Sequence, residues 1–250
     1  MPEGDALHRA AERLRVLEGE IISVETPHPR AAVLQLGERL DGRRLERVRA
    51  VGKNLLFEFE GDLVLRSHLR MHGRWRVEAA GSKPFGRPWL VLRGRLRQAV
   101  LWNGSVLELT RGRSPAAARL GPDIMASPPD LDEMIVRLRT TGQSREVGEA
   151  LLDQRLVSGI GNMWKAEALY ETAISPWTRL SQLDDTRLRL VLEETARLMQ
   201  AGRRRHGVYR RAGRPCRRCG ALVRSYAQGE QARTAYWCPV CQAGTGPAGA

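Results

Sequence analysis

Apolar residues in the first 110 positions of the chain follow two different spacings. Near the start they recur every three or four positions, as on one face of a helix: Leu7, Ala10, Ala11, Leu14 and Leu17. Gly19 ends this run. Eight short segments rich in Val, Leu and aromatic residues follow, at 20–25, 44–51, 54–60, 62–67, 74–79, 88–93, 98–103 and 105–110. The pattern predicts a helix followed by an antiparallel sandwich or barrel, within a domain of residues 1–112.

A change of composition follows this β-rich part. Residues 113–130 contain four prolines in 18 positions, which predicts a linker. Beyond it, helical periodicity covers 131–141, 144–156, 162–173 and 184–202, which together predict a helical domain of residues 131–206. Ser144 and Asp184 are the expected N-caps of two of these helices.

All four cysteines lie near the end of the chain. Cys216, Cys219, Cys238 and Cys241 have the spacing C-x2-C-x18-C-x2-C. Two such pairs offer four thiolates to a tetrahedral Zn²⁺, which leaves no open position, so the metal would be structural and not catalytic. A redox role would need only one pair. We expect a zinc finger at residues 207–242, with a hairpin between Cys219 and Cys238, and a disordered tail at 243–250.

The charge balance favours a polyanionic partner. The net charge is +13, from 41 basic and 28 acidic residues, and only three of the basic residues are lysines. Arginine suits phosphate because its planar fork donates two hydrogen bonds at once. An arginine-rich proteome is the alternative explanation. The chain has no apolar run of membrane-spanning length and no apolar leader, so we expect a cytoplasmic protein.

Three further segments are ambiguous when each is taken alone. In "SGIGNMW", two glycines expose the backbone before a helix that begins near Asn162, which suits phosphate but also suits an ordinary turn. In "SHLRMHGRW", Met71 at a loop tip between Arg70 and His72 could wedge into stacked bases or could fold back into the core. Lys53, at a glycine turn before a strand, could contact phosphate or simply be solvated.

The opening "MPEGD" allows amine chemistry at residue 2. The initiator Met before Pro is usually removed, so we expect Pro2 to become the free N-terminus. A free α-amine has a pKa of about 7.7–8.0, against about 10.4 for lysine, so an appreciable fraction is a nucleophile at neutral pH. Attack on a sugar C1′ would give an iminium that acts as an electron sink for eliminating phosphate. The adjacent Glu3 could serve as acid or base.

Five segments in this order, "MPEGD", "VGKNLLF", "SHLRMHG", "GIGNMWKAEAL" and "CRRCG…ARTAYWCPVCQ", together resemble the formamidopyrimidine-DNA glycosylase/endonuclease VIII family. The likeness spans residue 2 to about residue 242. It implies an α+β multidomain fold: an N-terminal antiparallel β-sandwich with a flanking helix, then a helix–two-turn–helix domain with a β-hairpin zinc finger. It also implies a monomeric, nucleoid-associated bacterial enzyme that flips damaged nucleotides out of double-stranded DNA.

The resemblance implies three catalytic residues. Pro2 would attack C1′ and release the base, after which β- and δ-elimination would cut the strand on both sides of the sugar. Glu3 would protonate the sugar ring oxygen as it opens. Lys53 would contact the phosphate next to the lesion and assist catalysis.

The DNA-binding residues that the resemblance implies lie in both halves of the chain. Asn162 and Arg233 would hold phosphates around the flipped nucleotide. Met71 would be the wedge residue, with Arg70 and His72 probing the orphaned base. His68 is a further candidate for a phosphate contact.

Two departures from the family bear on the lesion. Asp5 and Ala6 stand where the family often has Pro-Glu, so a second carboxylate is absent at position 6. The loop tip Arg-Met-His is also neither of the common family versions. Only 14 residues, 201–214, precede the first Pro-Cys of the finger, which leaves little room for the loop that covers oxidised purines in the glycosylase branch. The opening "MPEGD" also looks more like the endonuclease VIII branch of the family. We therefore expect oxidised pyrimidines, such as thymine glycol and dihydrouracil, and abasic sites as substrates.

The sequence is also compatible with three other functions. The first is a glycosylase specific for 8-oxoguanine and formamidopyrimidines. The second is a zinc-containing protein that binds damaged DNA without catalysis, although such a protein would have no need of Pro2, Glu3 and Lys53. The third is an RNA-binding zinc-ribbon protein.

Overall fold

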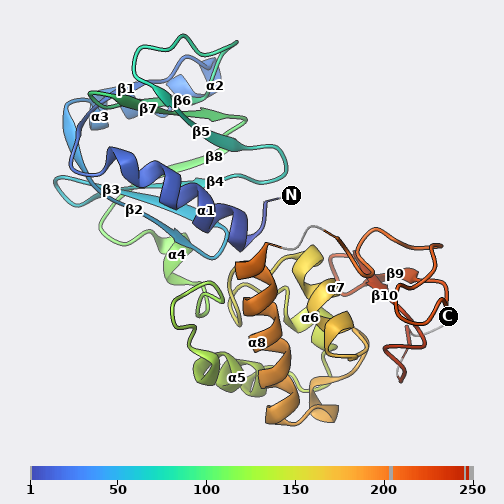
Figure 1. Cartoon of the computed structure of the whole chain (residues 1–250). Coiled ribbons are helices and arrows are strands. Elements are labelled where there is room, and N and C mark those ends of the chain that lie inside the picture. Colours follow the sequence, from blue (N-terminus) through green and yellow to red (C-terminus); the bar gives the residue numbers. More distant parts are fainter. Residues whose placement is uncertain (1, 203–204, 245, 248–250) are drawn as a thin grey trace. The chain divides into compact units, whose positions relative to one another are not determined.

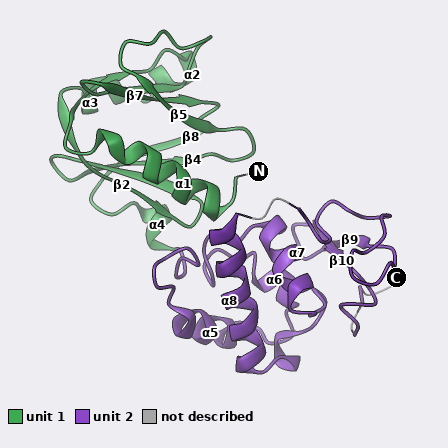
Figure 2. Cartoon of the chain, in the orientation of Figure 1, with its two compact units in different colours: residues 1–119 green, residues 120–250 purple. Residues whose placement is uncertain are grey.

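The computed structural model describes residues 2–202, 205–244 and 246–247 and divides the chain into two compact units, residues 1–119 and 120–250 (Figures 1 and 2). The expected disordered tail lies partly outside the described residues. No helix among these residues is long and apolar enough to cross a bilayer.

Unit 1 begins with helix α1 (Gly4–Leu14), which η1 (Arg15–Leu17) extends up to Gly19, whose φ is +81°. All eight expected strands are present: β1 (Ile21–Glu25), β2 (Arg43–Val51), β3 (Asn54–Phe59), β4 (Leu63–His68), β5 (Arg74–Ala79), β6 (Leu90–Arg93), β7 (Arg97–Trp102) and β8 (Val106–Arg111). The sequence analysis missed two short helices between β1 and β2, α2 (Pro29–Ala32) and α3 (Leu36–Leu40). A third short helix, α4 (Pro115–Ala118), lies in the segment expected to be a linker.

The strands form one antiparallel sheet in the order β5-β7-β6-β1-β2-β3-β4-β8. Its two four-stranded halves are joined by a β1–β2 pairing of only two residue pairs. Apolar side chains from α1 and from both halves share one core, which includes Leu7, Leu14, Phe57, Leu65 and Leu101. The pattern of alternating and buried apolar residues therefore predicted this unit correctly, including the flanking helix.

Unit 2 contains α5 (Leu131–Thr140), α6 (Val147–Ala150), α7 (Asn162–Glu171), η2 (Leu180–Gln182), α8 (Asp185–Ala201) and the hairpin of β9 (Arg224–Gln228) and β10 (Arg233–Trp237). Asp184 caps α8 as expected, since its carboxylate accepts from the amide of Arg187 at 2.8 Å. The helix expected at 144–156 is wrong in its bounds, because α6 ends at Ala150 and i→i+3 turns follow it. Its N-cap is Glu146 and not Ser144.

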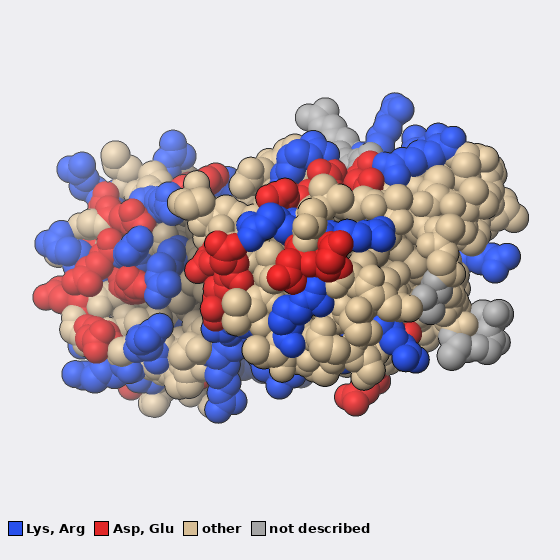
Figure 3. Space-filling view, turned by 90° about the horizontal axis from the view of Figure 1, so that it is seen from below, with Lys and Arg blue, Asp and Glu red and all other residues tan. Residues whose placement is uncertain are grey.

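Charges on helices α5 and α8 are partly paired. Figure 3 shows one face of the molecule, on which Lys and Arg side chains are interspersed with Asp and Glu and form no continuous basic patch. Between α5 and α8, Arg139 pairs with Asp185 at 2.7 Å, and Arg189 pairs with Asp132. The basic residues of these two helices are thus partly neutralised, so the net charge alone does not locate a polyanion site.

Candidate active site and metal centre

Pro2 and Glu3 lead directly into α1. Glu3 is the N-cap, with an extended backbone, and its carbonyl accepts from the amides of Ala6 and Leu7 at 2.9 and 3.3 Å. The Glu3 side chain does not cap the helix and is only 3% exposed, whereas Pro2 is partly exposed. An amine at residue 2 would therefore lie at the N-terminal end of a helix, with a buried carboxyl as its neighbour.

The two residues that depart from the family motif lie in the first turn of α1. Asp5 is 5% exposed and its carboxylate accepts from Arg9, one turn further on, at 2.6 Å. Ala6 packs against the core of unit 1. Position 6 thus presents a methyl group where the family often has a carboxylate, and the carboxylate of Asp5 is held by Arg9.

Lys53 lies in the two-residue turn between β2 and β3, where Val51 pairs with Asn54. Gly52, the first turn residue, has φ +57°, as a type II′ hairpin turn requires. Asn54 is buried, and its amide donates to the Val51 carbonyl at 3.3 Å and accepts from Arg66 at 2.9 Å. The lysine therefore extends from a turn whose base is fixed by side-chain hydrogen bonds.

The β3–β4 register brings this turn next to His68. Asn54 lies directly opposite His68, the last residue of β4. The pKa of His68 lies below its ordinary value, mainly because burial disfavours the charged ring and also because Arg66, Arg70 and Lys53 are close. The His68 Nδ1 accepts from the amide of Arg70 at 3.0 Å. The neutral ring therefore carries its proton on Nε2, where it can donate to a ligand.

The loop after β4 carries the candidate wedge. Arg70, Met71 and His72 are exposed, and Met71 is 52% exposed, so it is not a core residue. Gly73 closes the loop with an amide hydrogen bond of 2.8 Å to the Leu69 carbonyl. A Cβ at Gly73 would lie 2.5 Å from that oxygen, so the loop needs glycine at this position.

In unit 2, α7 begins at Asn162 as expected, directly after the glycine turn. The turn is held by Gln154, which the sequence analysis did not single out. Its amide nitrogen donates to the Leu152 and Ile160 carbonyls at 2.9 and 3.0 Å, and its oxygen accepts from the amide of Gly159 at 3.1 Å. One side chain thus ties Gly159 and Ile160, within the glycine turn, to the backbone at Leu152.

Asn162 and Arg233 are brought together within unit 2. The Asn162 amide nitrogen donates to the carbonyl of Thr234, the residue after Arg233, at 2.8 Å. Arg233 begins β10 and is exposed. Among the described residues it forms no ion pair, and its side-chain hydrogen-bond partner there is Gln231, whose oxygen lies 3.4 Å from two of its nitrogens. Its guanidinium is therefore available to a phosphate.

The four cysteines form one cluster, in which all the sulfur atoms lie within 4.8 Å of one another. The Cys216–Cys241 and Cys219–Cys238 sulfur distances are 3.8 and 3.5 Å. Four thiolates at about 2.3 Å from a tetrahedral Zn²⁺ would be about 3.8 Å apart, so the donor set and the spacing fit zinc. The amide of Cys241 donates to the Cys238 sulfur at 3.4 Å.

Helix α7 anchors the segment that leads into the finger. The buried carboxylate of Glu167 accepts from the amides of Gly207, Val208 and Tyr209 at 2.7, 3.1 and 2.9 Å. The Tyr170 hydroxyl contacts the Cys216 sulfur at 3.3 Å. The sequence analysis missed both residues, because a single carboxylate or tyrosine inside an apolar helix leaves no pattern that marks it.

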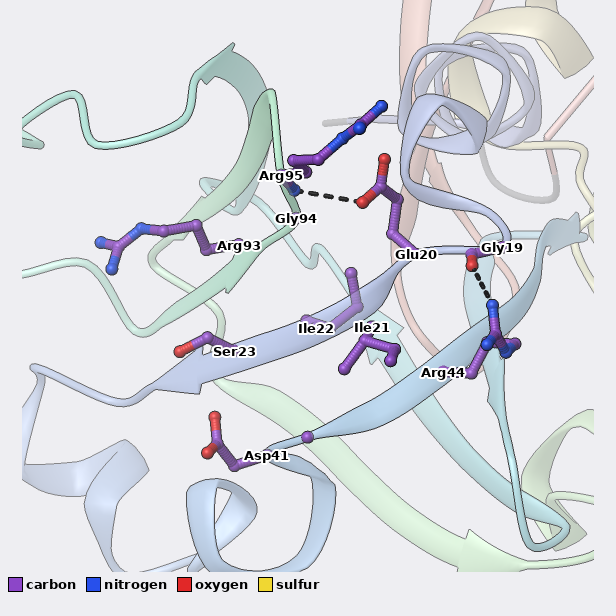
Figure 4. A pocket seen from close by; sticks show the side chains of 11 residues that line it. Gly19, Glu20, Ile21, Ile22, Ser23, Asp41, Arg44, Arg93, Gly94 and Arg95 are labelled. Carbon is purple, nitrogen blue, oxygen red and sulfur yellow. Dashed lines mark hydrogen bonds between the residues drawn. The ribbon is translucent and has the colours of Figure 1, made fainter.

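A pocket of about 570 Å³ lies elsewhere in unit 1, over the first residues of β1 and β2 (Figure 4). Two of its charged side chains bind the backbone: Arg44 donates to the Gly19 carbonyl at 2.6 Å, and Glu20 accepts from the amide of Arg95 at 3.1 Å. Lys53 follows the opposite end of β2, nine residues from Arg44, which corresponds to about 30 Å along a strand. This pocket is therefore separate from the Lys53–His68 cluster.

Comparison with known proteins agrees with this arrangement. The N-terminal domain of formamidopyrimidine-DNA glycosylase matches residues 1–115, and the H2TH domain of that family matches residues 120–211. A probable endonuclease 8 of Streptomyces coelicolor is 38% identical, over 99% of this chain and 96% of its own length. The DNA-(apurinic or apyrimidinic site) lyase Nei2 of Mycolicibacterium smegmatis is 34% identical, over 97% of this chain and 99% of its own.

A solved structure is similar along the whole chain. The formamidopyrimidine-DNA glycosylase of Lactococcus lactis, bound non-covalently to DNA with an abasic site, superposes with a TM-score of 0.82 at 25% identity. The match covers 97% of this chain and 100% of that one. The chain therefore belongs to the formamidopyrimidine-DNA glycosylase/endonuclease VIII family of DNA glycosylases and abasic-site lyases.

Proposed function

We propose that this enzyme excises oxidised bases, pyrimidines above all, from double-stranded DNA in base excision repair, through a Schiff base on Pro2. The observation that carries the proposal is the Pro2–Glu3 pair at the start of α1, in a chain that matches the family's two domains at residues 1–115 and 120–211. The partial positive charge of a helix N-terminus disfavours an ammonium there and so favours the neutral amine that the reaction needs.

The chemistry requires that Met1 be removed. The Pro2 nitrogen then forms a bond to C1′ and loses its proton, while the C1′–base bond breaks and the base leaves with that electron pair and takes up a proton. Glu3 donates a proton to O4′ as the C1′–O4′ bond breaks, and the nitrogen lone pair completes an iminium. Removal of a C2′ proton expels the 3′ phosphate, and the corresponding loss at C4′ expels the 5′ phosphate.

The remaining residues hold DNA in this proposal. Lys53 and His68 contact the phosphate next to the lesion, because their side chains gather at the end of the β2–β3 turn. Asn162 and Arg233 contact the same backbone from unit 2. Met71, with Arg70 and His72, fills the space that the flipped nucleotide leaves.

We also assign one structural Zn²⁺ to the four cysteines. It would hold the β9–β10 hairpin and so place Arg233, without touching a reacting group. Removal of zinc, or Cys219→Ser, is expected to abolish DNA binding while the thermal unfolding of unit 1 stays unchanged. Metal analysis combined with fluorescence anisotropy measures both effects, and full DNA affinity in a zinc-free protein would exclude this role.

The preference for pyrimidines is supported by the short connection between α8 and the finger. The backbone of residues 207–209 is bound by Glu167, so this part of the connection is held against α7. Several relatives are named endonuclease 8, in agreement with the endonuclease VIII branch that the opening of the chain resembles. Comparing excision of thymine glycol with excision of 8-oxoguanine in matched duplexes tests the preference, and faster excision of the purine would reverse it.

Borohydride trapping tests the proposed nucleophile. The protein with Met1 removed, mixed with duplex DNA that carries an abasic site, should give a covalent adduct that mass spectrometry maps to Pro2. The adduct should disappear in Pro2→Gly and in protein that retains Met1. Undiminished trapping in both of these variants would show that another amine reacts. If neither the variants nor the wild type gave an adduct, although the wild type bound damaged DNA tightly, the result would favour a protein that binds damaged DNA without catalysis.

A further inference from the structure

Strand β9 of the finger hairpin has a polar anchor in the helical part of unit 2. Strand β9 exposes residues 224–227 and buries only its last residue, Gln228, which is 4% exposed. A buried side-chain amide is costly unless its donors and acceptor are satisfied. The partners of Gln228 therefore decide where this end of the hairpin can lie.

Those partners come from three separate segments. The Gln228 amide nitrogen donates to the Glu146 carboxylate and to the Pro176 carbonyl, both at 2.8 Å. Its oxygen accepts from the ammonium of Lys165 at 3.4 Å. A carboxylate on one side and a cation on the other allow only one orientation of the amide.

The residues that bind Gln228 form a socket that fits this one side chain. Lys165 on α7 is fully buried, and Glu146 is the N-cap of α6. A Cβ at Gly148 would lie 2.5 Å from the Gln228 oxygen and 2.9 Å from the Pro176 carbonyl. Glycine at position 148 therefore leaves the room that Gln228 occupies.

Gln228 is also the cross-strand partner of Arg233. The two residues face each other where the β9–β10 ladder meets the hairpin loop. Directly opposed residues in an antiparallel pair have Cα atoms about 4.5–5.5 Å apart. Arg233 is thus flanked by two fixed points, since Gln228 lies opposite it and the carbonyl of the next residue, Thr234, is held by Asn162.

We propose that Gln228, held between Lys165 and Glu146, is a positioning residue that fixes Arg233 for its contact with DNA phosphate. The inference rests on the proposed function, in which Arg233 binds phosphate. Gln228 touches no DNA itself in this proposal. It acts only through the arginine on the opposite strand.

A double-mutant cycle tests the dependence on Arg233. The zinc-loaded, full-length protein is titrated with duplex DNA carrying a non-cleavable tetrahydrofuran abasic analogue, over a range of salt concentrations. Gln228→Ala and Arg233→Ala should each weaken binding, by about tenfold for Gln228→Ala. The double variant should bind as weakly as Arg233→Ala alone. Ser225→Ala, on the exposed part of β9, is the matched control and should bind as wild type does.

The salt dependence separates positioning from general damage to the fold. Losing one phosphate contact lowers the slope of log K against log salt by about 0.9. Gln228→Ala should show the same reduction as Arg233→Ala, whereas a merely destabilised protein would keep the wild-type slope. Zinc content and thermal unfolding are measured in parallel.

A charge swap keeps the test decisive if Gln228→Ala folds poorly. Gln228→Glu alone places a second carboxylate beside Glu146 and should weaken DNA binding. Gln228→Glu combined with Glu146→Gln exchanges the amide and the carboxylate between the two positions, so the total charge around position 228 is the same as in the wild type. The amide at position 146 can then donate to the carboxylate at position 228. This pair should recover part of the affinity that Gln228→Glu loses, because the Pro176 carbonyl still lacks its N–H donor from position 228.

The outcomes distinguish the two proposals. If Arg233→Ala binds DNA as tightly as wild type, the proposed role of Arg233 fails and this inference fails with it. If Arg233→Ala weakens binding but Gln228→Ala adds a full further loss in that background, or leaves the salt slope unchanged, only the positioning role of Gln228 is overturned. Failure of the charge swap to restore binding, in a protein that keeps its zinc and its unfolding temperature, also counts against it.

Discussion

The side-chain amide of Asn162 donates a 2.8 Å hydrogen bond to the backbone carbonyl of Thr234. Through this bond the first residue of α7 is connected to the finger strand that carries Arg233. The Asn162 oxygen is buried and has no hydrogen-bond partner among the described residues. The bond to Thr234 uses one of the side chain's two N–H groups, and under the proposed function the second would donate to the phosphate that Arg233 binds.

Asn162→Asp should therefore weaken binding to abasic-site DNA by about tenfold or more, because a carboxylate would face the Thr234 carbonyl and any bound phosphate. Fluorescence anisotropy at fixed salt measures the change. Gln200→Glu, an exposed position on α8, makes the same change in net charge and is the control. Equal losses in the two variants would mean that charge alone, and not this hydrogen bond, is responsible.

Lys53→Met should raise the pKa of His68, because it removes one of the three cations that disfavour the imidazolium. The pKa should stay below the ordinary value of 6.5, since burial, the largest cause, remains. Histidine NMR titration reads this directly, with Lys83→Met, in an exposed loop, as the control. Base excision should fall by about a hundredfold or more in the same variant. An unchanged His68 titration would show that the lysine lies elsewhere in solution.

Asp153→Asn should destabilise the protein at neutral pH and flatten its acid unfolding. The hydrogen bonds from Arg155 hold the pKa of Asp153 at about 2, below the ordinary value of 3.8. A carboxyl with a lowered folded pKa stabilises the native state above its unfolded pKa, and this stability is lost as pH falls from about 4 to about 2. Arg155 is largely exposed, so we expect about 1–2 kcal/mol.

Denaturant unfolding at pH 7, 4 and 2.5 measures the Asp153 contribution. The difference between wild type and Asp153→Asn should shrink steadily across this range. A difference that stays constant with pH would show that the ionised carboxylate is not the source of the stability.

Gly73→Ala should disorder the loop that carries Met71. The new Cβ would lie 2.5 Å from the Leu69 carbonyl, so the backbone must shift. Base excision should fall more than affinity for single-stranded DNA, because only duplex DNA needs the wedge. Gly142→Ala, where the nearest atom is 3.8 Å away, should change neither quantity. Wild-type excision by Gly73→Ala would remove the loop from the proposed mechanism.

The β-rich unit was predictable because its strands are short, apolar and bounded by turn residues. The helical unit was predicted less well around 144–156, where the sequence has helical periodicity throughout. There the turn residues are set by side chains, with Gln154 and Asp153 binding nearby backbone amides and carbonyls, so α6 ends at Ala150. A periodic pattern cannot reveal such a side-chain competitor for the backbone.

The candidate site, like the fold, could be predicted from the sequence only in part. The motif residues could be identified singly, but the proximity of Lys53 to His68 depends on the β3–β4 register, which no local pattern specifies. Gln228 and Glu167 were missed for a different reason. Each is one polar residue whose partners lie 40 or more positions away along the chain, so only the folded structure reveals what it does.

Helix α7 reaches the finger with five of its ten residues: Asn162 through Thr234, Lys165 through Gln228, Glu167 through 207–209, Tyr170 through Cys216 and Glu171 through Arg218. The finger is consequently not an interchangeable module. A finger transplanted alone from another member of the family would arrive without its matching contacts, whereas helix and finger moved as a pair would carry them along. Natural chimaeras and engineered hybrids should therefore have their junctions before the glycine turn, and substitutions in α7 and in the hairpin should be inherited together.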